Sequence, residues 1–285
     1  MAQARPTAPL SVPARARVLG VPLALGGYPE VLDWIDDAVA LRTPSYMTAA
    51  AVHLVMLAHE DETVRNAVLG ASLVVPDGQP LVWALRLYGH REIRSRIYGP
   101  DLMLACCERL ASRGTPMYLY GGRSETALVA LALELRTRFP GLEIVGAHSP
   151  PHVGGTPGSP FREPTAEEDQ STIEAIDGSG AEIVWVGTGQ PRQELWMARM
   201  RPRLQAPMLI GVGAAFDFHA GLVPQAPAWL GRHGLEWGYR LAREPRRLWR
   251  RYLRYNPRFV VAVAREYAEM RRSPGRRQAD DPGRR

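Results

Sequence analysis

The stretch E-I-V-W-V-G-T-G, residues 182–189, joins an apolar, β-favouring run to two glycines. The same pattern recurs in four other segments: S-L-V-V-P-D-G (72–78), M-Y-L-Y-G-G (117–122), L-E-I-V-G-A (142–147) and M-L-I-G-V-G-A (208–214). Segments with helical periodicity lie between them, most clearly residues 125–138, which end before F-P-G at 139–141. This alternation predicts βαβ units, and therefore an α/β fold with a mostly parallel sheet covered by helices.

The composition indicates a globular chain whose two ends differ from the rest. The 285 residues are 46% hydrophobic and 22% charged, which allows a large core without disulfides. Residues 1–14 are rich in Pro, Ala and Arg, and residues 273–285 have no large apolar side chain, so we predict a disordered tail at each end. Between the tails we predict an α/β domain at 15–235 and a basic helical appendage at 236–272.

The sequence predicts neither a membrane span nor disulfides. No apolar run approaches the ~20 residues that are needed to cross a bilayer. Residues 18–25 could imitate the apolar core of a signal peptide, but Gly20 and Pro22 interrupt them, and we interpret them as a strand. The two cysteines, Cys106 and Cys107, are adjacent and cannot easily pair, which fits a reducing compartment.

Positive charge is concentrated towards the C-terminus. All 35 basic residues are arginine, a preference that the codon bias of a GC-rich genome would explain, and the formal net charge is +6. Their position is more informative, because eight arginines fall within 240–258, where Glu244 is the one acidic residue. A helix that begins at Pro245 would place arginines on one face and apolar or aromatic side chains on another. This basic amphipathic helix indicates a polyanionic partner.

The residues that follow the predicted strands are the candidates for a binding site. In an open parallel sheet, ligands bind beyond the carboxyl ends of the strands, so residues there can meet around one cleft. Glycines at these positions let backbone N–H groups approach a phosphate closely. The candidates of this kind are Asp77, Gly121, Gly122, Gly187, Gly189 and Asp217.

Local patterns leave several alternatives open. Pro-Asp-Gly at 76–78 is a favoured turn sequence without any catalytic duty, so the tripeptide alone favours a simple turn. The stretch G-V-G-A-A-F at 211–216 lacks the third glycine of a dinucleotide fingerprint, which disfavours NAD. His53 and His59 do not have the spacing of metal ligands on a helix, and no Asp-x-Asp follows a predicted strand. We therefore expect metal-independent chemistry and no cofactor.

Taken together and in order, the motifs resemble the WecG/TagA/CpsF family of bacterial glycosyltransferases from about Val18 to Leu253. Besides V-V-P-D-G and Y-L-Y-G-G, the resemblance depends on R-I-Y-G-P-D-L (96–102), F-P-G-L-E-I-V-G (139–146), V-G-T-G-Q-P-R-Q-E-L-W (186–196), G-V-G-A-A-F-D-F-H-A-G (211–221) and G-L-E-W-G-Y-R-L-A-R-E-P-R-R-L-W-R-R-Y-L (234–253). It implies a Rossmann-like fold and inverting transfer of a sugar from a UDP-sugar to a polyprenyl-diphosphate-linked sugar. This transfer would occur at the cytoplasmic face of the membrane, in cell-envelope or exopolysaccharide synthesis.

The resemblance also assigns roles to individual residues. Asp77 corresponds to the proposed general base, Thr48 and Gln193 to polar residues that line the pocket, and Asp217 to a residue near the nucleotide. Arg96 lies in the R-I-Y-G-P-D-L motif. The arginines of the C-terminal appendage, which in the family closes over the active site and helps the protein sit on the membrane, are Arg240, Arg247 and Arg250.

Two roles for these arginines remain open. A leaving diphosphate gains negative charge in the transition state, which guanidinium groups can stabilise where no metal does. Alternatively, the arginines contact anionic lipid headgroups. A non-catalytic sugar-nucleotide-binding, membrane-associated module is the rival to an enzyme. Nucleic-acid binding is disfavoured, because the aromatic residues of the basic helix face its apolar side, and a homo-oligomer is possible.

The sequence departs from the family pattern at two positions. Ala50 stands where an asparagine is usual, and Gln225 stands where an arginine is usual. The Pro/Gly-rich segment 149–165 also looks longer than usual. These departures leave open the identity of the donor sugar, for which N-acetylmannosamine, its uronic acid and a glucose-type sugar are the candidates.

Overall fold

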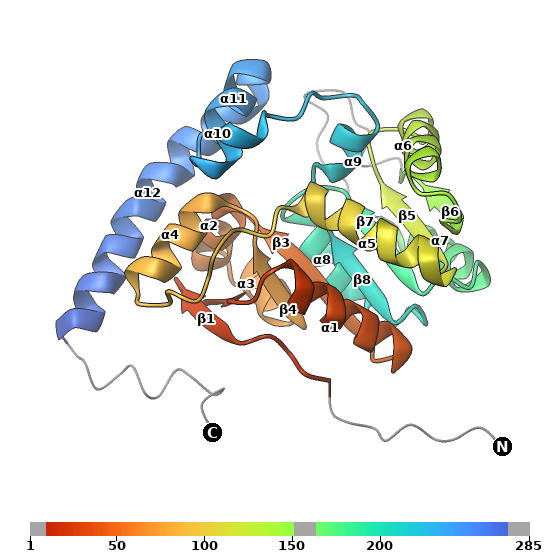
Figure 1. Ribbon diagram of the computed structural model, residues 1–285, viewed down its shortest axis with the longest axis horizontal. Helices are drawn as coiled ribbons and strands as arrows, with labels where there is room; N and C mark the ends of the chain where they lie inside the picture. The colour runs from red at the N-terminus through yellow and green to blue at the C-terminus, as the bar shows by residue number, and fades with distance from the viewer. Residues whose placement is uncertain (1–9, 151–163, 273–285) are drawn as a thin grey trace.

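The computed structural model describes residues 10–150 and 164–272 and has a six-stranded parallel sheet at its centre (Figure 1). The strands run in the spatial order β4-β3-β8-β7-β5-β6, and every neighbouring pair is parallel. Their bounds are β3 Ser45–Ala50, β4 Leu73–Pro76, β5 Met117–Gly121, β6 Ile144–His148, β7 Ile183–Gly187 and β8 Met208–Gly211. The predicted Rossmann-like α/β fold is confirmed.

Helices cover both faces of the sheet. Their bounds are α1 Tyr28–Ala40, α2 Val52–Glu60, α3 Glu62–Leu69, α4 Gln79–Leu87, α5 Gly99–Arg113, α6 Glu125–Arg138, α7 Ala166–Gly178, α8 Arg192–Met200 and α9 Ala215–His219. Helix α6 has the bounds that the sequence predicts. It begins at a Ser124 side chain that accepts a hydrogen bond from the Ala127 N–H, and it ends before Phe139.

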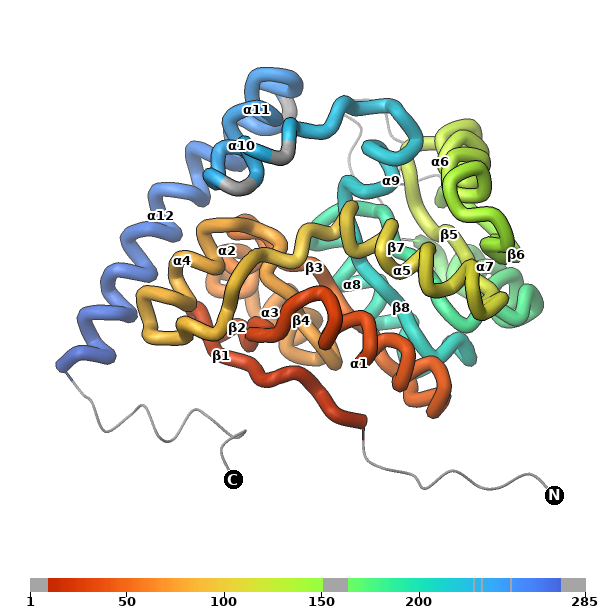
Figure 2. Tube along the Cα trace, in the orientation of Figure 1, coloured from red at the N-terminus to blue at the C-terminus, as the bar shows by residue number. Residues whose placement is uncertain are grey.

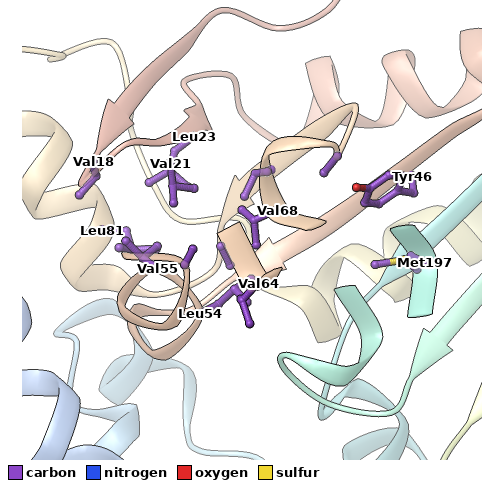
Figure 3. Packing of buried hydrophobic residues seen from close by; sticks show 14 of the residues in the cluster. Val18, Val21, Leu23, Tyr46, Leu54, Val55, Val64, Val68, Leu81 and Met197 are labelled. Atoms are coloured by element: carbon purple, nitrogen blue, oxygen red, sulfur yellow. The ribbon is translucent and has the colours of Figure 1, made fainter. Parts of the chain in front are cut away.

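Alternation along each strand divides the apolar residues into two cores. In β7, Val184 and Val186 face the helices α2, α3 and α8, whereas Ile183 and Trp185 face α1, α5 and α6. Successive side chains of a strand point to opposite faces, so a strand covered on both sides is apolar throughout. Figure 3 shows part of the first core, where Leu54 and Val68 of α2 and α3 pack with residues of several other elements.

The interpretation of residues 18–25 as one strand is wrong. They contribute to an antiparallel hairpin of β1 Arg15–Val18 and β2 Val21–Ala24, in which Val18 pairs with Val21. Leu19 and Gly20 form the turn, and both have positive φ values of 51° and 83°. Gly20 adopts this conformation without a steric penalty, so it reverses the chain where the sequence pattern continues to look like a strand.

Strand β3 is absent from the repeated sequence pattern. Its residues S-Y-M-T-A-A are all buried, but the strand is followed by Ala51 and not by a glycine or another turn residue. It nevertheless lies between β4 and β8 near the middle of the sheet. This position places the carboxyl end of β3 directly beside that of β4.

After α9, the described chain continues with α10 Ala228–Arg232, α11 Glu236–Arg243 and α12 Pro245–Arg272. Helix α12 starts at the predicted Pro245 and runs along one side of the molecule past α2 (Figure 2). Tyr255, Phe259 and Val263 form its buried stripe. Near its C-terminal end, the Glu266 carboxylate accepts hydrogen bonds from the Leu19 N–H (2.9 Å) and the Tyr88 hydroxyl (2.6 Å). These contacts fix the middle and the C-terminal part of α12 against the rest of the protein.

The predicted tails and the long Pro/Gly-rich segment fall largely or wholly outside the described residues. Residues 1–9, 151–163 and 273–285 belong to these segments. Among residues 10–150 and 164–272, no helix combines the length and the apolar character that crossing a membrane requires.

Candidate functional site

A cavity of about 400 Å³ opens at the carboxyl ends of the strands, between the sheet and the helices α11 and α12. Segments that follow five of the six strands contribute to it. The predicted residues that line it are Asp77, Arg96, Gly122, Gly187, Gly189, Asp217 and Arg240. Residues from distant parts of the sequence therefore meet at one place because the parallel strands all end there.

Asp77 lies in the short connection between β4 and α4. Its backbone N–H donates to the Ala50 carbonyl (2.9 Å), and its Oδ1 accepts from the N–H of Gly99 (2.7 Å), the first residue of α5. The N-terminus of a helix favours a negative charge, so this contact orients the carboxylate. Burial nevertheless raises the pKa of Asp77 to about 6. The positive charge of Arg96 lowers this pKa, and the negative charge of Glu236 raises it. The turn that the sequence predicts at 76–78 therefore also carries the carboxylate of Asp77 into the cavity.

Ala50 lies beneath the loop that carries Asp77. Its side chain is fully buried, and its carbonyl accepts hydrogen bonds from the N–H groups of Asp77 (2.9 Å) and Gly78 (3.4 Å). The cavity is lined by the two flanking residues, Ala49 and Ala51. The contribution of Ala50 is therefore its backbone carbonyl, which any residue in this conformation would supply.

Thr48 and Gln193 lie below the floor of the cavity and do not line it. Both are fully buried, and both bind the equally buried Glu194: the Thr48 hydroxyl and the Gln193 Nε2 (2.8 Å) donate to Glu194 Oε1. Gln193 Oε1 in turn accepts from the N–H of Gly213 (2.9 Å), which does line the cavity. The two residues expected to line the pocket instead support its floor, because their side chains point between β3, β8 and α8.

Replacing Glu194 by glutamine is expected to stabilise the protein more at pH 8 than at pH 5. Burial raises the pKa of Glu194 to about 7, although hydrogen bonds from Thr48 and Gln193 lower it. In the unfolded chain this carboxyl ionises at its ordinary, lower pKa. Its stabilising contribution is therefore complete below that ordinary pKa and is lost as the pH rises through about 7.

The expected gain in the free energy of unfolding is on the order of 1–3 kcal/mol at pH 8 and smaller at pH 5. Denaturant unfolding of the wild-type and variant proteins at both pH values measures it. If the difference in the free energy of unfolding between the two proteins is the same at both pH values, the raised pKa of Glu194 is contradicted.

The glycines that follow β5 and β7 serve two different purposes. A Cβ at Gly121 would lie 2.7 Å from the backbone of Gly187, and Gly121 has a φ of 124°, so this glycine allows two strands to approach. It does not line the cavity. Gly189 has a φ of 80° and open space where a Cβ would be, at the edge of the cavity. Gly189 is therefore the better candidate for close approach of a ligand.

Arginines from two parts of the chain surround the cavity. Arg96 stacks over the ring of Tyr98 (4.2 Å) and forms an ion pair with Glu236 of α11 (2.6 Å). Arg240 of α11 lies over the ring of Phe218 (5.5 Å). Arg250 is exposed beside Trp249 and does not line the cavity, and the side chain of Arg247 is outside the described part of the structure.

Sequence reasoning missed several residues of the site. Arg123 lines the cavity and forms two parallel hydrogen bonds of 2.9 Å to Asp217, together with a longer contact to Glu244 (3.4 Å). Arg251 lines the cavity as well, and Glu236 contributes the carboxylate that binds Arg96. Arg123 directly follows the glycine pair at 121–122, which is a signal that could have identified it. Within the described ranges, no three His, Cys, Asp or Glu side chains could together hold a metal ion.

At the carboxyl ends of the parallel strands, several guanidinium groups and glycine loops surround a carboxylate, an arrangement that suits the binding of an anionic substrate. The model of the Glycosyl transferase WecG/TagA/CpsF family matches residues 16–273, so the chain belongs to this family. The predicted family is thereby confirmed, and the match extends through α12. The protein is a glycosyltransferase of cell-envelope polysaccharide biosynthesis, with a sugar donor and an acceptor as its substrates.

Proposed function

We propose that this glycosyltransferase moves a sugar from a UDP-sugar to a polyprenyl-diphosphate-linked sugar, with inversion at the anomeric carbon. The observation that carries the proposal is the position of Asp77, a partly buried carboxylate that lines the cavity between Arg96 and Arg240. The donor sugar is N-acetylmannosamine, its uronic acid or a glucose-type sugar, as the family resemblance suggests.

In the proposed reaction, Asp77 takes the proton from the acceptor hydroxyl as the hydroxyl oxygen bonds to the anomeric carbon of the donor. The bond from that carbon to the phosphate oxygen breaks, and its electron pair leaves with UDP. A carboxylate within hydrogen-bonding distance assists such an attack, and the raised pKa of Asp77, about 6, makes it a stronger base than an ordinary aspartate while leaving it ionised at neutral pH. Attack on the face opposite the leaving group inverts the anomeric configuration.

The arginines provide the positive charge for the leaving diphosphate. Arg240 and Arg96 line the cavity together with the backbone at Gly122 and Gly189. Fixed guanidinium groups stabilise charge as it develops, since they need not reorganise during the step. The mechanism therefore assigns to protein side chains the task that a divalent ion performs in other transferases.

The test is a transfer assay with purified protein, a panel of UDP-sugars and a polyprenyl-diphosphate-linked acceptor, in buffer with and without EDTA. Product formation with one donor, unaffected by EDTA, would support the proposal, and the linkage of the product reports the stereochemistry. Tight binding of a UDP-sugar without product would favour the non-catalytic module. Loss of activity in EDTA would contradict metal independence.

We also propose that α12 rests on an anionic membrane surface on the cytoplasmic side. Its exposed face carries Trp249, Leu253 and Val260 beside exposed arginines. Aromatic and aliphatic side chains next to arginines suit the boundary between headgroups and acyl chains. The lipid-linked acceptor would then reach the cavity from the membrane.

Replacing Trp249 and Leu253 together by alanine is expected to weaken binding to vesicles that contain anionic lipid by about tenfold or more, because each side chain buries apolar area in the bilayer. Vesicle flotation measures the bound fraction. The matched control replaces Val129 and Leu133 of α6 by alanine; these side chains are 68% and 66% exposed, at least as much as Trp249 (44%) and Leu253 (66%). Equal effects of the two double variants would contradict a membrane role for α12.

A further inference from the structure

Glu236 is an acidic residue at the first position of α11, where it faces the sheet domain. Its side chain is 11% exposed, and its Oε2 lies 2.6 Å from Nη2 of Arg96, whose own side chain is 17% exposed. Arg96 belongs to the segment that precedes α5, far from Glu236 in the sequence. This ion pair therefore joins the C-terminal helices to the wall of the cavity.

Arg96 lies close to the residue that we propose as the base. Its Nη1 is 3.4 Å from the backbone carbonyl oxygen of Asp77, and its guanidinium stacks over the Tyr98 ring. The only hydrogen bond that the described structure shows for the Asp77 carboxylate comes from the Gly99 N–H, and not from Arg96. Without the ion pair to Glu236, the Arg96 guanidinium would be near enough to pair with the ionised carboxylate of Asp77.

We propose that Glu236 is a positioning residue that holds the Arg96 guanidinium away from the Asp77 carboxylate, so that docking of α11 leaves this carboxylate available to accept a proton. The inference rests on the proposed role of Asp77 as the base. It assigns to the C-terminal helices a function beyond supplying arginines, because they also supply the acid that separates Arg96 from Asp77.

The charges around Asp77 are consistent with this arrangement. Arg96 and Tyr98 face it from the segment before α5, Glu236 and Arg240 from α11, and Tyr28 from α1. Burial raises the pKa of Asp77 most, Arg96 lowers it, Glu236 raises it and Arg240 lowers it. A direct pair with Arg96 would lower the pKa further and occupy an oxygen that must receive the proton.

The experiment is a double-mutant cycle on the full chain with Glu236→Gln and Arg96→Gln. The pKa of Asp77 is measured by NMR titration of carboxyl-labelled aspartate, and kcat and KM are measured in the transfer assay. Glu236→Gln alone is expected to lower the pKa of Asp77 by about one to two pH units and kcat by about tenfold, with little change in KM for the donor. In the Arg96→Gln background, the same change should have a much smaller effect on the pKa.

The control is Glu269→Gln, an exposed acid on α12, which should leave the pKa of Asp77 unchanged. An equal fall in this pKa in both Arg96 backgrounds, or no fall in either, would overturn the proposal. If Glu236→Gln fails to fold, Glu236→Asp replaces it and is expected to give a smaller fall in the same direction, again only when Arg96 is present. Absence of transfer by the wild-type protein would contradict the proposed function, whereas the pKa cycle would still decide the role of Glu236.

Discussion

Replacing Asp77 by asparagine is expected to reduce the rate of sugar transfer by about 10²–10⁴-fold while the protein remains folded. Asparagine has the shape of aspartate, and its side-chain oxygen can still accept the hydrogen bond that the Gly99 N–H donates to Asp77. It cannot take a proton from the acceptor hydroxyl. The fold should not suffer, because the amide also removes a charge whose burial raises the pKa of Asp77.

Initial rates of product formation measure this effect, and wild-type transfer should rise with pH through about 6 as Asp77 loses its proton. The matched control is Asp61→Asn, because Asp61 caps α3 through the Val64 N–H and asparagine caps equally well. This control should retain the wild-type rate and pH profile. Transfer by the Asp77 variant at the wild-type rate would exclude Asp77 as the base.

Replacing Arg240 by glutamine is expected to lower kcat by about 10²–10³-fold, the usual cost of removing one group that stabilises transition-state charge. Arg240 lines the cavity, and although burial lowers its pKa, the surrounding groups Tyr252, Glu236, Tyr98 and Asp77 together raise it above the usual value, so the side chain stays charged. Glutamine can still donate a hydrogen bond but carries no charge. The loss should therefore appear in kcat more than in the affinity for the acceptor.

The matched control for the Arg240→Gln variant is Arg243→Gln, which changes an arginine one turn further along α11. Arg243 is exposed, lies over the Tyr239 ring (5.4 Å) and does not line the cavity. We expect less than a twofold change in kcat for this variant on a short-chain, water-soluble acceptor. Equal losses at both positions would mean that α11 acts through its overall charge, and a normal kcat for the Arg240 variant would remove this residue from the mechanism.

Much of the fold could be predicted because its signals are local. Apolar runs that end in glycine or a turn identified five of the six strands, and helical periodicity with a terminal F-P-G identified α6. The errors have local causes as well. The hairpin at Leu19 and Gly20 was overlooked because a turn of only two residues leaves the apolar run nearly unbroken. Strand β3 was overlooked because it is followed by alanine and not by a glycine or another turn residue.

The site was predicted in part. Asp77, Gly122, Gly189, Asp217 and Arg240 all line the cavity, since strand ends and the C-terminal helices converge there. Thr48 and Gln193 were expected in the pocket but are fully buried beneath it. Sequence position alone does not distinguish a polar side chain that touches the ligand from one that supports the loop behind it.

The sequence by itself determined the alternation of strands and helices over most of the sheet, the family and the acidic residue that follows β4, because each depends on neighbouring residues or on ordered motifs. Only the tertiary structure decided which charges face one another. Arg123 pairs with Asp217 and Arg96 with Glu236 because parallel strands and a docked α11 bring distant segments to one cavity. Electrostatic interactions depend on distance and burial, which are properties of the packed chain and are absent from the order of its residues.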